Sequence, residues 1–78
     1  MPTAFRSGPY LFFFYSSDRN EPIHIHIERD DNTAKFWLQP LQLQEAGGFK
    51  ASELRHIERL VRRHHDTLIR SWNEFFGN

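Results

Sequence analysis

The chain has 78 residues, which suits one small domain near the lower size at which a hydrophobic core alone supports a fold. Ten Lys and Arg residues balance ten Asp and Glu residues, so net charge provides no overall attraction to nucleic acid or membranes. Cysteine is absent, which excludes disulfides and thiolate metal sites, and no apolar run is long enough to span a bilayer. We therefore expect a single cytoplasmic domain that has no signal peptide.

The N-terminal part of the chain predicts an irregular leader followed by a buried strand. Residues 1–9 contain Pro2, Gly8 and Pro9, which interrupt regular structure. The continuous apolar run at 10–15 then predicts a strand that is buried on both faces and lies near the centre of a sheet. Residues 16–21 are polar and rich in turn formers, so we expect a loop there.

Residues 23–28 alternate isoleucine with histidine and glutamate, which predicts a strand with two different faces. The three isoleucines form an apolar face that would pack in the core. His24, His26 and Glu28 line the opposite face. This row is the one place in the chain where strand geometry alone aligns several titratable groups.

A third strand is predicted at 33–38, after a four-residue turn. A turn of this length places His26 opposite Lys35 and His24 opposite Trp37. Apolar residues then face apolar residues on one side of the sheet, while polar residues gather on the other. The remaining expected pairs are Glu28 with Thr33, Ile27 with Ala34, and Ile25 with Phe36.

The last part of the chain predicts a possible short edge strand at 41–44 and then a helix at 52–76, with Ser52 as N-cap candidate or with a slightly earlier start. One straight helix would be roughly 37 Å long, so we expect a break near 64–66, with Asp66 capping the second half. The helix is expected to cover the isoleucine face. The predicted fold is α+β, a small antiparallel meander of three strands, with a possible short fourth, and a long or kinked C-terminal helix packed on one face.

Several sequence landmarks together resemble one small bacterial family. They are the Phe-rich strand ending Phe-Tyr-Ser, an Asp-containing loop, Pro22-x-His24-x-His26-x-Glu28, Ala34-Lys35-Phe36-Trp37-Leu38-x-Pro40, Gly48-Phe49 before a helix, and the ending Trp72-Asn73-Glu74-Phe75-Phe76. This combination resembles the domain of unknown function (DUF) 4160 family over nearly the whole chain. Ile23 departs from the proline that the family usually repeats, and Arg19 lies in a variable loop.

The resemblance implies a fold and a genetic context rather than an activity. The family has no established activity, and its members resemble parts of toxin–antitoxin-like operons. They are often encoded beside a second small domain of unknown function. The resemblance therefore implies a small protein partner and a link to nucleic acid.

The row of His24, His26 and Glu28 is the first candidate site. Two imidazoles at i and i+2 can reach one divalent metal ion, with Glu28 or a residue of the neighbouring strand as third ligand. The same histidines can instead serve as general acid and base, with Glu28 orienting or ligating and Lys35 or Arg6 binding phosphate. The alternative is an ordinary solvent-exposed strand face with cross-strand pairs.

Arginines on the predicted helix form the second candidate site. They fall within about a third of the helix circumference, opposite the apolar stripe, and arginine suits phosphate binding. They are Arg55, Arg59, Arg62, Arg63 and Arg70. Trp37 is the candidate for stacking on a base. The alternative is a solvated surface neutralised by i,i+4 salt bridges, for which the candidate pairs are Glu58–Arg62, Asp66–Arg70 and Arg70–Glu74.

Three further histidines lie on the helix. His64 and His65 either extend the His24/His26 cluster or mark the helix break, and His56 is expected at the surface.

Three functions are compatible with these features. The leading hypothesis is a component of a toxin–antitoxin-like module that binds a partner protein and RNA or DNA. The second is a small nuclease or phosphoryl-transfer hydrolase that uses the strand histidines. The third is a structural oligomerisation domain, such as a homodimer, which uses the aromatic sheet and the C-terminal residues Trp72, Phe75 and Phe76.

Overall fold

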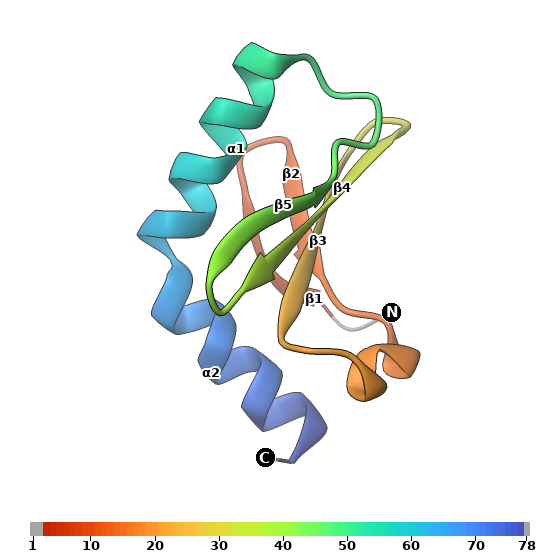
Figure 1. The fold of residues 1–78 in the computed structure, drawn as a ribbon, viewed down its shortest axis with the longest axis vertical. Coiled ribbons are helices and arrows are strands. Elements are labelled where there is room, and N and C mark those ends of the chain that lie inside the picture. Colours follow the sequence, from red (N-terminus) through yellow and green to blue (C-terminus); the bar gives the residue numbers. More distant parts are fainter. Residues whose placement is uncertain (1–2, 78) are drawn as a thin grey trace.

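Antiparallel pairing follows the chain from each strand to the next, so the five-stranded sheet has the order β1-β2-β3-β4-β5 (Figure 1). The computed structural model describes residues 3–77. The elements in chain order are β1 (Thr3–Ser7), β2 (Tyr10–Phe13), the 3-10 helix η1 (Ser16–Asn20), β3 (His24–Arg29), β4 (Asn32–Leu38), β5 (Leu41–Glu45), α1 (Ala51–Arg63) and α2 (His65–Phe76). The α+β class is confirmed, and residues 3–77 form five strands and two α-helices in place of the expected three or four strands and one helix.

The β3–β4 hairpin forms in the predicted register. His26 pairs with Lys35 and His24 with Trp37, and all the other expected pairs are also present. The ladder continues one pair further, through Arg29 and Asn32, so only two residues remain in the loop. The predicted edge strand also forms, as β5, and lies beside β4.

Strand β1 corrects the prediction of an irregular leader. Residues 3–7 pair with β2 through a two-residue loop of Gly8 and Pro9, in which Gly8 has a φ of +56°. A glycine with positive φ in a two-residue hairpin loop matches the twist of antiparallel strands, so these residues continue the sheet. Phe5 stacks on Phe12 with ring centroids 4.4 Å apart. Residues 1–2 of the predicted leader lie outside the described residues.

The predicted break in the C-terminal helix occurs at His64, which ends α1 and precedes α2. The imidazole of His64 packs against the ring of Phe5, and Nε2 of His65 donates a hydrogen bond to the carbonyl of Leu38. These contacts hold the break against the sheet. The helix begins at Ala51, slightly before Ser52, so the earlier start is confirmed and Ser52 is not the N-cap. The predicted cap at Asp66 is wrong, because α2 begins directly after His64.

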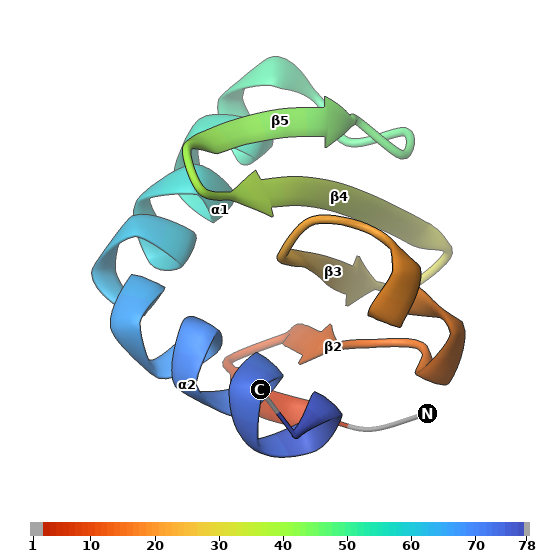
Figure 2. The ribbon, with the colours of Figure 1, turned by 60° about the horizontal axis from the view of Figure 1, so that its bottom comes forward.

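The two helices cover the isoleucine face of the sheet, as predicted, and follow its curvature (Figure 2). Ile25 and Ile27 are fully buried there. The core that surrounds them combines sheet and helix residues, among them Phe12, Phe14, Phe36, Leu38, Ile57, Val61, Leu68 and Trp72. No helix within residues 3–77 has the length and apolar character needed to cross a membrane. On the face of the sheet that carries His24 and His26, η1 packs against β3.

Candidate functional site

Three side chains that can bind a metal ion meet on the sheet face opposite α1. His24 and His26 alternate with the buried isoleucines of β3, and Asp18 joins them from η1. Figure 2 shows η1 beside β3, on the other side of the sheet from α1. Oδ2 of Asp18 lies 3.0 Å from Nε2 of His26 and 3.2 Å from Nε2 of His24. The three ligand atoms all lie within 4.8 Å of one another.

Local backbone contacts hold the Asp18 carboxylate in place. Its Oδ2 accepts a hydrogen bond of 2.8 Å from the backbone N–H of Tyr15, at the start of η1. The guanidinium of Arg19 donates to the carbonyl of Phe76 and so connects η1 to the end of α2. The side chain of Asp18 is only 7 % exposed.

His24 is held in one tautomer by its surroundings. Its Nδ1 lies 2.8 Å from the carbonyl oxygen of Pro22, which can only accept a hydrogen bond, so Nδ1 carries a proton. Its Nε2 is buried and has no hydrogen-bond partner among residues 3–77. The rings of Trp37 and Trp72 pack on the imidazole, at centroid distances of 5.5 and 5.1 Å.

His26 lies in a similar but slightly more open environment, between the rings of Phe13 and Tyr15. Its side chain is 12 % exposed. Burial lowers the pKa of His26 below its usual value, and the negative charge of Asp18 only partly opposes this effect. The imidazole therefore favours its neutral form, which has a nitrogen lone pair available for a ligand.

The predicted catalytic set is only partly brought together. Glu28 lies on the same sheet face but is not part of the cluster, and Asp18 supplies the carboxylate instead. Lys35 is opposite His26 as predicted, yet its ammonium is paired with Glu21 at 2.6 Å. Because the side chain of His24 is fully buried, the geometry fits a ligand better than an acid or base open to substrate.

Sequence reasoning missed Asp18, although the Asp-containing loop was one of the landmarks of the family resemblance. Asp18 lies close to the histidines only because η1 folds back over β3, and residue spacing does not reveal this path of the chain. The helix histidines do not join the cluster, because His64 and His65 lie at the helix break on the other face of the sheet. His56 is exposed, as expected.

The arginines of the second candidate site are all exposed. Of the predicted salt bridges, the pair Glu58–Arg62 forms, at 2.9 Å. Neither pair predicted for Arg70 is present within residues 3–77, and Arg70 lies on α2, beyond the break. Trp37 lies on the histidine face of the sheet, where its indole N–H donates to Gln44. The structure therefore does not place Trp37 beside the arginines.

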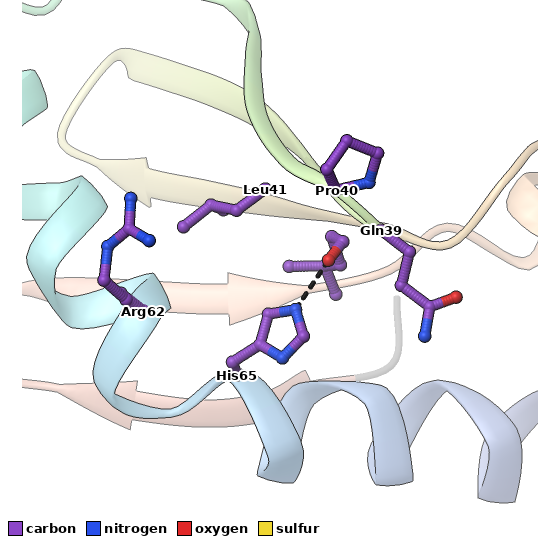
Figure 3. Close-up of a pocket in the computed structure, with 6 residues that line it drawn as sticks. Gln39, Pro40, Leu41, Arg62 and His65 are labelled. Atoms are coloured by element: carbon purple, nitrogen blue, oxygen red, sulfur yellow. Dashed lines mark hydrogen bonds between the residues drawn. The ribbon is translucent and has the colours of Figure 1, made fainter.

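A pocket of about 470 Å³ lies between the helix break and the β4–β5 turn (Figure 3). Arg62 and His65 reach it from the helices, and residues Leu38, Gln39, Pro40 and Leu41 line the side formed by the sheet. Arg62 thus belongs both to the exposed arginines and to the wall of this pocket.

Comparison with protein families identifies the family of this chain. A family described as Domain of unknown function (DUF4160) matches residues 10–73. No curated protein and no solved structure matches the chain.

Proposed function

The chain belongs to the DUF4160 family, which has no established activity. From the surface of the chain, we propose that α1 binds the phosphate backbone of RNA or DNA. The observation that carries the proposal is the row of exposed arginines on the solvent side of this helix, Arg55, Arg59, Arg62 and Arg63. Planar guanidinium groups donate two parallel hydrogen bonds to phosphate, so a row of them suits a polyanion.

The arginine row keeps its positive charge although the chain as a whole is neutral. Arg55, Arg59 and Arg63 have no ion-pair partner within residues 3–77. Glu58 neutralises Arg62, while Glu53, the other carboxylate of α1, is turned away to Arg29 and Tyr10. A local excess of positive charge on one face attracts nucleic acid even when net charge is zero.

The dimensions of the row suit several phosphates. Arg55 and Arg63 are eight residues apart, which corresponds to about 12 Å along a helix axis. Phosphates of one DNA strand are spaced by about 3.4 Å along the duplex axis, so the row spans about three to four of them. The pocket beside Arg62 adds an apolar wall next to the arginine row (Figure 3).

Fluorescence anisotropy with labelled single- and double-stranded RNA and DNA tests the proposal. The binding constant of the wild type should fall with salt, because bound phosphates release counterions. Arg59→Ala should weaken binding and lower the slope against log salt by about one. Arg6→Ala is the matched control, since it removes one exposed positive charge from β1 rather than from α1.

Two results would contradict the proposal. One is the absence of salt-dependent binding to every oligonucleotide at low salt. The other is an equal loss of affinity in Arg59→Ala and Arg6→Ala, which would indicate a general effect of charge rather than a site on α1.

The proposal extends to a toxin–antitoxin-like module with a small protein partner, which the family resemblance implies. Where a small protein is encoded beside this chain, its co-expression with the chain, followed by size-exclusion chromatography, should give one complex. The growth of a bacterial host is then measured after expression of this chain alone is induced. Growth arrest would indicate a toxic role, and normal growth an antitoxin or accessory role. Separate elution of the two proteins would remove the partner from the proposal.

A further inference from the structure

We propose that Asp18, His24 and His26 form a binding site for one divalent transition-metal ion of the zinc class. The ligand atoms are one carboxylate oxygen and two imidazole nitrogens. This donor set suits zinc and its neighbours in the first transition row, whereas magnesium and calcium prefer sites made of oxygen alone. The inference concerns the opposite side of the sheet from α1 and does not depend on nucleic-acid binding.

The separations between the donor atoms fit a shared ion. Ligands bound at about 2.0–2.1 Å around a tetrahedral zinc ion lie about 3.3 Å from one another. Oδ2 of Asp18 lies 3.0 Å from Nε2 of His26 and 3.2 Å from Nε2 of His24. All three ligand atoms lie within 4.8 Å of one another, so small side-chain rotations bring them around one centre.

The tautomer of His24 provides an independent indication. Its Nδ1–H is committed to the carbonyl of Pro22, which leaves the lone pair of Nε2 directed at the cluster. Metal-binding histidines are commonly oriented in this way, by a hydrogen bond from their other ring nitrogen. Nε2 is completely buried without a hydrogen-bond partner in residues 3–77, and a bond to a metal ion would satisfy it.

A simple ion pair explains the cluster less well. For His24 to donate to Asp18, both of its ring nitrogens would need a proton, which makes a charged imidazolium at 0 % exposure. Oδ2 of Asp18 already accepts from the backbone of Tyr15 and lies within hydrogen-bond distance of His26. A metal ion allows both imidazoles to remain neutral while its own charge balances the carboxylate.

Isothermal titration of chelator-treated protein with Zn²⁺ tests the proposal directly. The wild type should bind one Zn²⁺ per chain. At zinc about 100-fold above Kd, its Tm should rise by about 10 °C or more, whereas Mg²⁺ should leave it unchanged. Co²⁺, used as a spectroscopic probe, should show the visible absorption of a site with nitrogen and oxygen ligands. Imidazole ¹⁵N shifts of His24 and His26 should move on adding Zn²⁺.

Variants then assign the ligands. Asp18→Asn and His26→Gln should each weaken Zn²⁺ binding at least about 100-fold, more than loss of a supporting contact would. His56→Gln, which removes an exposed histidine on α1, is the matched control and should bind like the wild type. Circular dichroism confirms that each variant is folded.

The proposal is overturned if the wild type takes up no Zn²⁺, or if its bound Zn²⁺ leaves the ¹⁵N shifts of His24 and His26 unchanged. It is also overturned if folded Asp18→Asn and His26→Gln bind as tightly as His56→Gln. The imidazole shifts of the wild type decide the question even if a variant does not fold.

Discussion

Asp18 and His26 are joined by a contact of 3.0 Å that fixes η1 on the open face of the sheet. The same carboxylate oxygen accepts the backbone N–H of Tyr15, so one buried group supports both η1 and β3. Removing it leaves polar partners without a hydrogen bond in a mostly buried place. We expect Asp18→Ala to lower the free energy of unfolding by about 1–3 kcal/mol in metal-free buffer.

Urea denaturation of the metal-chelated protein measures this difference. Asp31→Ala is the control, because Asp31 is exposed at the turn of the β3–β4 hairpin. An exposed substitution of this kind should change stability by no more than about 0.5 kcal/mol. Equal effects of the two substitutions would show that the contacts of Asp18 contribute no net stability.

The contact between Glu53 and Arg29 predicts a dependence of stability on pH. Arg29 donates from two nitrogens to the Glu53 carboxylate, with Nη2 at 2.7 Å from Oε1, and Tyr10 adds a third hydrogen bond. The hydrogen bonds from Arg29 lower the pKa of Glu53 below the ordinary value of a glutamate carboxyl group. The group therefore contributes stability above this value, which is lost as pH falls through the lower pKa of the folded state.

Thermal unfolding of the wild type and Glu53→Gln between about pH 7 and about pH 3 measures this contribution. The wild type should have the higher Tm near neutral pH, and the difference should shrink as the carboxylate becomes protonated in the acidic part of the range. Glu74→Gln provides the control, because Glu74 is exposed on α2 and has no ion-pair partner within the described chain. A Tm difference that stayed constant over the whole range would contradict the prediction.

Gly47 is required by both backbone conformation and close packing. Its φ is +62°, and an added Cβ would lie 1.8 Å from the carbonyl oxygen of Thr33 in β4. Gly8 also has a positive φ, of +56°, but no atom outside Gly8 and its two chain neighbours lies within 4 Å of the equivalent Cβ position. Gly8→Ala should therefore cost about 1–2 kcal/mol for conformation alone, whereas Gly47→Ala should cost more because the β4 backbone must also move.

Comparison of the two alanine variants by urea denaturation isolates the steric effect, since both substitutions place alanine at positive φ. The amide resonances of Thr33 and Ala34 should shift in Gly47→Ala and remain unchanged in Gly8→Ala. Equal losses of stability would indicate that the chain between β5 and α1 moves away from β4 without cost.

The local sequence pattern was sufficient to predict those parts of the fold in which the paired segments lie close together in the sequence. The alternation at His24–Arg29 determines both faces of β3, and the short turn fixes its register with β4. The helix break at His64 follows from length, because a straight helix would extend past the sheet. Strand β1 was missed because its alternation is weak, and it is stabilised mainly by Phe5 packing on Phe12 and His64.

The candidate site depended on contacts that residue spacing does not encode. The histidine pair could be identified from strand periodicity, but its carboxylate partner could not, because Asp18 reaches the cluster only through the path of η1. Glu28 had the expected spacing and yet lies apart from the cluster. Trp37 and the arginines could not be assigned to opposite sides of the sheet until the helices were placed.

The neighbouring residues Phe75 and Phe76 predict effects of very different size for the same substitution. Phe76 is 5 % exposed and packs on Trp72 with ring centroids 4.4 Å apart, whereas Phe75 is 44 % exposed. Phe76→Ala should lower the free energy of unfolding by about 3–5 kcal/mol, because it removes a buried ring and leaves a cavity. Phe75→Ala should change it by no more than about 1 kcal/mol.

Urea denaturation of the two variants provides the measurement, and sedimentation of the same samples tests the predicted homodimer. Trp72 and Phe76 are committed to the core, so only Phe75 of the three C-terminal aromatics remains exposed for a second copy of the chain. If the chain dimerises through this end, Phe75→Ala should weaken the dimer while leaving the monomer folded. A large loss of monomer stability in Phe75→Ala would contradict the burial pattern, because it would mean that this ring supports the core.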